Sequence, residues 1–341
     1  MISFRRFFAI FNARNKEFYR DWGALGWTLL FPIVMIFSFS YLFEISNQNT
    51  YKLAYVGGKA PKILQTRSLA FQSIDEALDK LQHHKIDLVV QKEETDVGRI
   101  YKYWVNEASP TSQILEKLWL ADGVSSVDQV IRENMRIEPI GYVDWLLPGL
   151  LAMNVMMMTM WGVGWVIVRQ RKLGILKRLK VSPLNAVEYL LAQMVSRQWI
   201  LLLSGVFVFG FAHMIYPFSN QGSLWEIAVI YVLGGLSMSA FGLIIAARMQ
   251  SDELASGLLN FITMPMMMLS EVWFSLEGSP EWVLTLAQSL PLWHMADGMR
   301  KIMLEGAHLS DLSTSLLYLL VSGFFFTALG SWMFRWNIDG E

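Results

Sequence analysis

A basic segment at residues 169–184 carries the side chains best suited to a specific contact in this 341-residue chain. It contains cations and no carboxylate: Arg169, Arg171, Lys172, Lys177, Arg178 and Lys180. Apolar runs without Asp, Glu, Lys or Arg lie on both sides of it, at residues 145–168 and 198–216. Because Lys and Arg near the ends of membrane spans set their orientation, this pattern predicts a cytoplasmic loop between two spans.

The same segment also has a helical pattern. Its apolar residues recur near helical spacing with cations between them, and a Ser-Pro break follows: Leu173, Leu176, Leu179, Val181, Ser182 and Pro183. One interpretation is a short helix under the bilayer that offers an apolar and basic surface to a soluble partner. The other is an ordinary positively charged loop that touches lipid headgroups, and charge alone does not separate the two.

Two groups of side chains could bind metal ions. Methionine thioethers suit soft ions, and one predicted span is rich in them: Met153, Met156, Met157, Met158 and Met160. This cluster has no Cys or His neighbour, so we interpret it as a flexible apolar wall or plain packing. His83 and His84 are adjacent, but neighbours on a helix point about 100° apart and no third ligand is obvious, so a metal site is not favoured there.

Composition sets the class of protein. Hydrophobic residues make up 54 % of the chain and charged residues 17 %, below the roughly 25 % typical of soluble domains. The net charge of -1 implies no bulk attraction to nucleic acid, and without cysteine there is no disulfide, thiolate metal site or cysteine nucleophile. The sequence has no Gly-x-x-x-x-Gly-Lys-Ser/Thr loop, so ATP hydrolysis would have to occur on another chain.

The amino-terminal residues predict an amphipathic helix followed by a span. In residues 1–21, phenylalanines recur at helical spacing and cations cover much of the rest, as in helices that lie in the membrane interface. The uncharged run at 22–43 is long enough to cross about 30 Å of hydrocarbon and has no small-x-small cleavage signal. We therefore expect an uncleaved first span, kinked at Pro32, rather than a signal peptide.

Residues 44–140 change character and contain no run long enough to span a membrane. Strands are predicted at 52–58, 86–90 and 99–105, and helices at 74–84 and from Ser109-Pro110 onward. These elements predict a small α/β domain inserted between the first and second spans. It would lie outside the cell membrane if the amino end is cytoplasmic.

Residues 141–338 predict five further spans, at about 145–168, 195–216, 227–247, 254–270 and 312–334. The net acidic stretch 271–311 is expected outside, with 283–290 and 296–304 as re-entrant or interfacial helices. The predicted fold class is thus an α-helical polytopic membrane protein. It has six transmembrane helices, an extracytoplasmic α/β domain between helices 1 and 2, and both termini in the cytoplasm.

The basic segment resembles the coupling-helix loop of ABC-2 type transporter permeases, the membrane subunits of bacterial ABC exporters. Gly174, Leu176, Arg178-Leu179 and Ser182-Pro183-Leu184 carry the resemblance, whereas Gln170 and Lys177 stand where the family usually has glutamates. In that family the loop docks into a groove on the ATPase subunit. The resemblance implies that ATPase coupling involves the following residues: Arg171, Leu173, Gly174, Leu176, Lys177, Arg178, Leu179, Ser182 and Pro183.

The carboxyl half is similar to the same family at 242–248, 260–270 and 290–300, although Glu271 and Ser275 replace residues that are common there. The resemblance covers residues 1 to about 338, and the large domain after the first span resembles the drug-export branch. It implies a multi-pass protein of the bacterial inner membrane that is not itself an enzyme. It also implies no cofactor in this chain, because ATP and Mg would be bound by partner ABC ATPase subunits.

The expected function is a permease subunit of an ATP-driven exporter that moves a hydrophobic or amphipathic compound out of the cytoplasm or the inner leaflet. A second permease, identical or a sister subunit, is expected because a lone six-span bundle has no obvious conduit. A periplasmic adaptor is compatible with the outer domain but is not required. The predicted substrate path is lined as follows: Met153, Asn154, Met157, Met160, Met264, Met267 and Glu271. Glu271 would either receive cationic substrates or be a solvated residue.

Two other classes remain open. One is a sensor or receptor in the membrane that acts beside an ABC ATPase. The other is an intramembrane enzyme, which needs acid, base or nucleophile pairs, whereas the predicted spans hold almost no ionisable group. Co-purification of an ATPase would favour the exporter.

Overall fold

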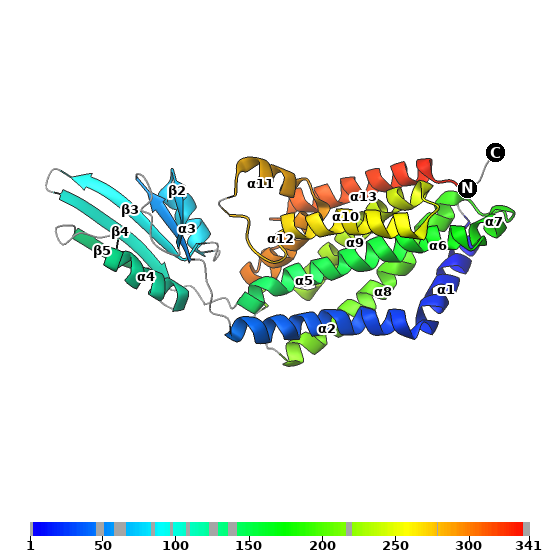
Figure 1. Cartoon of the computed structure of the whole chain (residues 1–341), viewed down its shortest axis with the longest axis horizontal. Coiled ribbons are helices and arrows are strands. Elements are labelled where there is room, and N and C mark those ends of the chain that lie inside the picture. The colour runs from blue at the N-terminus through cyan, green and yellow to red at the C-terminus, as the bar shows by residue number, and fades with distance from the viewer. Residues whose placement is uncertain are drawn as a thin grey trace. The chain divides into compact units, whose positions relative to one another are not determined.

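The computed structural model describes residues 3–45, 51–57, 66–82, 86–95, 98–106, 110–122, 129–135, 142–215, 220–277 and 279–336. These residues form two compact units. A helical unit comprises Met1–Tyr41 and Val143–Glu341, and an α/β unit comprises Leu42–Tyr142. Both units are seen in Figure 1.

The α/β unit is built on a five-stranded sheet with the strand order β2-β1-β3-β4-β5. Its strands are β1 (Tyr51–Val56), β2 (Thr66–Phe71), β3 (Leu88–Thr95), β4 (Gly98–Asn106) and β5 (Gln129–Met135). Neighbouring strands are parallel except for the antiparallel pair β3–β4. The sequence pattern predicts β1, β3 and β4 but not β2 or β5, the two strands at the ends of the order.

Helices α3 (Ile74–Gln82) and α4 (Pro110–Asp122) pack on opposite faces of this sheet. Alternate residues of β1 face the two helices: Leu53 belongs to the cluster that contains Trp119 of α4, and Ala54 to the cluster that contains Leu81 of α3. A central strand that is buried on both faces has a continuous apolar sequence, and for this reason β3 could be predicted from the sequence. His83 and His84 lie outside the described residues. Among the residues that the structure describes, no group of three or more His, Cys, Asp and Glu side chains could hold a metal ion.

The helical unit contains the remaining elements. They are α1 (Phe4–Arg20), α2 (Trp22–Ile45), α5 (Tyr142–Thr159), η1 (Met160–Trp165), α6 (Val166–Lys172), α7 (Ile175–Lys180), α8 (Ala186–Ile215), α9 (Leu224–Arg248), α10 (Asp252–Leu269), α11 (Glu281–Gln288), α12 (Pro291–Glu305) and α13 (Ser313–Met333). A helix therefore occupies each position where a span is predicted. The two segments predicted as re-entrant or interfacial helices form α11 and α12, and their relation to a membrane stays a prediction. Helix α8 begins well before the predicted residue 195.

Four helices among the described residues are long and apolar enough to cross a membrane: Asp144–Lys172, Ala186–Met214, Leu224–Arg248 and Ser313–Met333. Helix α2 runs over Trp22–Ile45 and is apolar over Trp22–Met35, the part in which the structure describes every side chain. Helix α10 has 18 residues and begins with Asp252 and Glu253. Membrane crossing by α2 and α10, and hence the six-span arrangement, stays a prediction.

Small residues of α9 let three helices approach it closely. A Cβ on Gly234 would lie 2.4 Å from the sulfur of Met295 in α12, and one on Gly235 would lie 2.6 Å from Gln198 in α8. Ser237 shares a 2.9 Å hydrogen bond with Ser322 of α13. Helix α9 is therefore the central element against which the unit packs, as expected for small residues at helix contacts within membranes.

Between α5 and α6 the chain makes one π-helical stretch, η1. Such stretches leave a backbone carbonyl without its usual helical partner. The Nε of Arg197 in α8 donates to the Met158 carbonyl at 2.6 Å, and Arg14 of α1 donates to the Gly162 carbonyl at 3.3 Å. Two arginines from other helices thus satisfy carbonyls in and just before the stretch that leads to residues 169–184.

Candidate functional site: the basic hairpin

Residues 169–184, hereafter the basic hairpin, form two short helical pieces separated by a turn. Helix α6 ends at Lys172, and α7 begins at Ile175. Gly174 between them has φ 72°, a left-handed conformation that glycine adopts without steric cost. The short helix expected in the segment is therefore present, and the turn before it redirects the chain.

Arg171 points into the protein and joins three helices. Its guanidinium donates to the Ala246 carbonyl at 2.8 Å and the Ala247 carbonyl at 3.2 Å, near the carboxyl end of α9, and also to the Met249 carbonyl. It donates to the Arg335 carbonyl at 3.0 Å, just after α13, and lies over the ring of Phe334. The last carbonyls of a helix have no partner within the helix and carry partial negative charge, so a cation is well placed there.

Further contacts join the basic hairpin, and residue 185 just after it, to the ends of neighbouring helices. The buried carboxylate of Glu188 in α8 accepts from the backbone amides of Ser3 at 2.7 Å and Asn185 at 3.1 Å. Arg6 of α1 donates to the Pro183 carbonyl. Lys172 pairs with Asp252 at the start of α10 at 3.1 Å. The basic hairpin is thus connected to α1, α9, α10 and α13.

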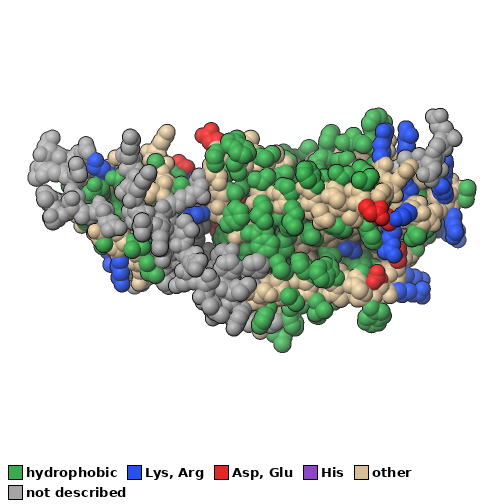
Figure 2. Space-filling model, in the orientation of Figure 1, with side chains coloured by type: hydrophobic (Ala, Val, Ile, Leu, Met, Phe, Trp, Pro, Cys, Tyr) green, Lys and Arg blue, Asp and Glu red, His purple; other side chains and the backbone are tan. Residues whose placement is uncertain are grey.

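The solvent-exposed surface of the basic hairpin combines cations with apolar side chains. Val181 is 89 % exposed and Leu173 60 % exposed. Lys172, Lys177, Arg178, Lys180 and Pro183 are also exposed. Figure 2 shows Lys and Arg side chains gathered at the end of the helical unit where α7 lies in Figure 1. Nearby, the Ser251 hydroxyl lowers the pKa of Glu253, so this carboxylate beside Lys172 stays ionised.

The residues predicted for coupling divide into three sets. Leu173, Lys177, Arg178 and Pro183 are exposed, and three are partly buried: Gly174, Leu179 and Ser182. Arg171 and Leu176 instead point inward, Leu176 into an apolar cluster of the helical unit. These two residues position the basic hairpin, and the exposed set forms the surface that a partner could touch.

The residues predicted for the substrate path do not share one surface. Met153, Met160 and Met267 are buried in the main apolar core, with Met157 packed against it. Asn154 is also buried, and within the described residues its Nδ2 has no hydrogen-bond partner. Met264 faces outward and is 57 % exposed. The structure therefore gathers the α5 methionines into packing and leaves Met264 on the outer face of α10.

Glu271 is held by contacts within the chain. Its carboxylate accepts from the Leu276 amide at 3.1 Å and lies 3.7 Å from Arg300. Its carbonyl accepts from Arg300 at 2.8 Å, and its φ of 53° places it in the left-handed region. Arg300 also lies 4.2 Å from the centre of the Trp145 ring. Glu271 is thus partly buried and already contacts Arg300 and the Leu276 amide, and its role toward cationic substrates stays a prediction.

Sequence reasoning missed three charges that shape the helical unit: the buried Glu188 and Arg300, and the partly buried Arg197. Their signal is the presence of a charge beside or within an apolar run, which marks a residue with a specific buried partner. The partners could not be named, because they lie far away in the sequence.

Four helices of membrane-spanning length and the connected basic hairpin define a multi-pass helical membrane protein. Residues 22–332 match the family model described as ABC-2 family transporter protein. The chain belongs to this family.

Relatives with curated names are permeases. The chain is 24 % identical over 244 residues to the probable multidrug ABC transporter permease YbhR of Escherichia coli K12, covering 72 % of this chain and 66 % of that protein. It is 26 % identical over 162 residues to the putative transport permease YvfS of Bacillus subtilis 168, covering 47 % of this chain and 66 % of YvfS. It is 27 % identical over 164 residues to the linearmycin resistance permease protein LnrN of the same strain, covering 46 % of this chain and 40 % of LnrN. The matches thus span less than two thirds of these relatives' own lengths.

Proposed function

We propose that this chain is the permease subunit of an ATP-driven exporter that moves a hydrophobic or amphipathic compound out of the cytoplasm or the inner leaflet. A separate ABC ATPase, which binds ATP and Mg, docks on the exposed surface of the basic hairpin. The family and the names of the relatives, a multidrug transporter permease and a linearmycin resistance permease, support this reading. The observation that carries it is the connection of one exposed basic surface to the ends of α1, α9, α10 and α13.

Docking at this surface has a direct route to the spans. Force on α7 reaches α6 through the Gly174 turn, and Arg171 then transmits it to α9 and α13 through hydrogen bonds. Because a buried guanidinium with several acceptors holds its geometry, the connected helices move together rather than independently. We propose that this joint movement opens the substrate path, at an interface with a second permease.

The proposed topology places the basic hairpin and both termini in the cytoplasm and the α/β unit outside. The cation-rich segments are α1 and the basic hairpin, which the positive-inside rule assigns to the cytoplasmic side. The exposed apolar face of α10, with Phe261, Met264 and Met268, is available to a second permease or to lipid.

The test reverses the charge of side chains on the exposed surface of the basic hairpin. Lys177→Glu and Arg178→Glu, singly and together, are compared with Lys117→Glu, the same exchange at an exposed position of α4. Full-length protein is co-expressed with the ABC ATPase that co-purifies with it, and ATPase stimulation and export are measured. The double variant should weaken the association at least about tenfold, because each reversal replaces attraction by repulsion. Unchanged values in the double variant, or an equal loss with Lys117→Glu, would remove the docking assignment.

A further inference from the structure

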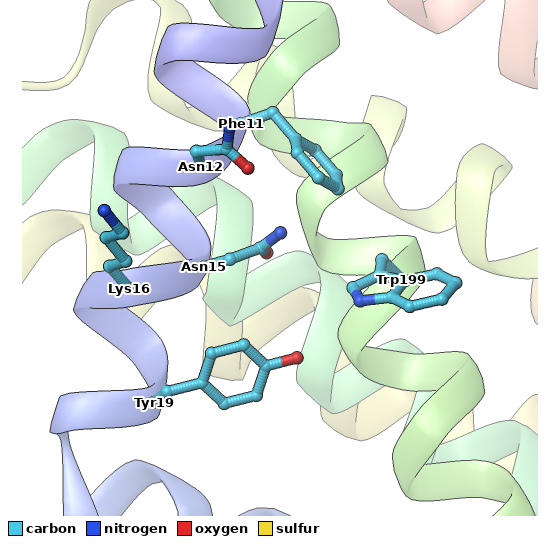
Figure 3. Close-up of a pocket in the computed structure, with 6 residues that line it drawn as sticks. All are labelled: Phe11, Asn12, Asn15, Lys16, Tyr19 and Trp199. Carbon is cyan, nitrogen blue, oxygen red and sulfur yellow. The ribbon is translucent and has the colours of Figure 1, made fainter.

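A pocket of about 470 Å³ opens between α1 and α8. Its lining residues are Phe11, Asn12, Asn15, Lys16 and Tyr19 of α1 and Trp199 of α8 (Figure 3). The α1 residues follow helical spacing, so α1 presents one continuous stripe to the pocket. The pocket is wide open, so it suits a group held at a surface rather than a ligand enclosed by protein.

Two polar side chains of this stripe, Asn15 and Lys16, can interact with a ligand in the pocket. Asn15 is buried, and its Oδ1 accepts from the Ser196 hydroxyl at 2.6 Å, which fixes the amide. Its Nδ2 lies on the Trp199 side of α1 in Figure 3. Among the described residues, the structure gives neither this Nδ2 nor the ammonium of Lys16 a hydrogen-bond or ion-pair partner. The pocket therefore offers hydrogen-bond donors and one cation at its border.

The remaining walls are aromatic. Tyr19 and Trp199 are about half exposed, at 46 % and 48 %, and Phe11 lies beside them. Tyr and Trp are enriched where hydrocarbon meets headgroups, because each has an apolar ring and a polar tip. Helix α1 also exposes Phe4 and Phe8, as expected of a helix lying in a membrane interface.

The charge around the pocket is positive. A neighbouring hollow of about 690 Å³ shares Lys16 and is also bordered by Arg20, one helical turn later. Two carboxylates also border this hollow, and both have partners: Glu17 pairs with Arg14 at 2.7 Å, and Asp21 accepts from the Ala24 amide at 3.0 Å. An anionic group near Lys16 would therefore meet two cations.

We propose that the pocket binds the headgroup region of an anionic phospholipid. Lys16 pairs with the phosphate, Asn15 donates from Nδ2 to an ester or phosphate oxygen, and the three rings flank the glycerol and the first acyl carbons. A soluble anion would not use the apolar surface of these rings. A zwitterionic lipid such as phosphatidylcholine also has a phosphate for Lys16, but its quaternary ammonium would lie near Lys16 and Arg20 and be repelled, so a lipid with net negative charge is favoured. The bound lipid would hold α1 against α8, beside the contacts that connect α1 to the basic hairpin. This inference depends on the proposed membrane placement and not on ATPase docking.

The test uses quenching of tryptophan fluorescence by brominated lipid in detergent micelles with the full-length protein. Brominated phosphatidylglycerol should quench at lower mole fraction than brominated phosphatidylcholine. This excess should disappear in Trp199→Phe, and Lys16→Gln should raise the half-saturating fraction about fivefold. Two matched controls should keep the excess: Trp332→Phe, which removes an exposed ring elsewhere, and Arg5→Gln, which removes an exposed cation of α1 that does not line the pocket.

Three results would overturn the proposal. Equal quenching by both lipids would show that the headgroup charge is not recognised. An excess that survives Trp199→Phe would place the lipid elsewhere. An equal effect of Arg5→Gln and Lys16→Gln would show that the lipid is attracted by the overall positive charge of α1 and not by Lys16 in the pocket. Each outcome is independent of ATPase stimulation, so the exporter proposal and the lipid site can fail separately.

Discussion

Replacing Arg171 by methionine keeps most of the side chain's length and removes the guanidinium that joins α6 to α9 and α13. The residue is 6 % exposed, and the residues that own two of its acceptor carbonyls, Ala246 and Ala247, are fully buried. A hydrogen bond to a charged group contributes about 1.5–3 kcal/mol, so loss of these two alone should cost about 3 kcal/mol. The hydrogen bonds from Arg171 to the carbonyls of Met249 and Arg335 are only partly buried. Water can replace the lost donor there, so these two bonds are not counted in the cost.

The assay is thermal unfolding of the purified protein in detergent, followed by tryptophan fluorescence. At roughly 2–4 °C per kcal/mol, Arg171→Met should lower the Tm by about 6–12 °C. Arg171→Lys should fall between wild type and Arg171→Met, because an ammonium keeps the charge but cannot reach both helix ends at once.

The matched control is Arg178→Met, the same exchange on the exposed side of α7. It should change stability by less than about 0.5 kcal/mol and weaken ATPase association instead. An Arg171→Met protein as stable as wild type would refute the inward role, as would an Arg178→Met protein that loses stability to the same extent.

Three further predictions follow from other parts of the chain. Gly149→Ala would place a Cβ 2.7 Å from the Val272 carbonyl oxygen and should lower the free energy of unfolding by about 1–3 kcal/mol. Gly257→Ala, which has open space around it, should be neutral or stabilising. Equal effects of the two substitutions on thermal unfolding would contradict the close approach at Gly149. Burial and the hydrogen bond that Tyr103 donates to Glu116 raise the pKa of Tyr103 to about 12, so its stabilising effect is complete below pH 10 and disappears as the pH rises toward 12. The tyrosinate absorbance of wild type minus Tyr103→Phe should then titrate near 12, and a midpoint near 10 would count against it. Glu271→Gln should lower the Tm without changing the ratio of export between cationic and neutral compounds, because the carboxylate contacts the Leu276 amide and Arg300. A selective loss of cation export would instead support a substrate role for Glu271.

The sequence was most informative where composition alone determines structure. The apolar run of β3 is visible because both of its faces are buried, and long uncharged runs predict helices at the positions of α8, α9 and α13. The edge strands β2 and β5 carry polar and charged residues such as Arg67, Arg132 and Glu133, so no apolar pattern reveals them.

The basic hairpin could be identified from the sequence as a candidate site, but its inward and exposed residues could not be told apart. The basic residues of the hairpin look alike in sequence, and nothing local separates Arg171 from Arg178. The inward direction of Arg171 depends on carbonyls 75 and 164 residues away, at the ends of α9 and α13. The π-helical stretch η1 depends in the same way on Arg197 and Arg14, which supply donors from other helices.

The central claim is that the basic hairpin faces the cytosol and is covered there by a motor protein. The chain contains no cysteine, so Val181→Cys, at a position of the basic hairpin that is 89 % exposed, provides a unique label site. Lys117→Cys in the α/β unit provides the opposite control. A membrane-impermeant thiol reagent should label Lys117→Cys but not Val181→Cys in intact cells. In inverted vesicles it should label Val181→Cys, and bound ATPase should protect the site. Labelling of Val181→Cys from outside intact cells would contradict the account.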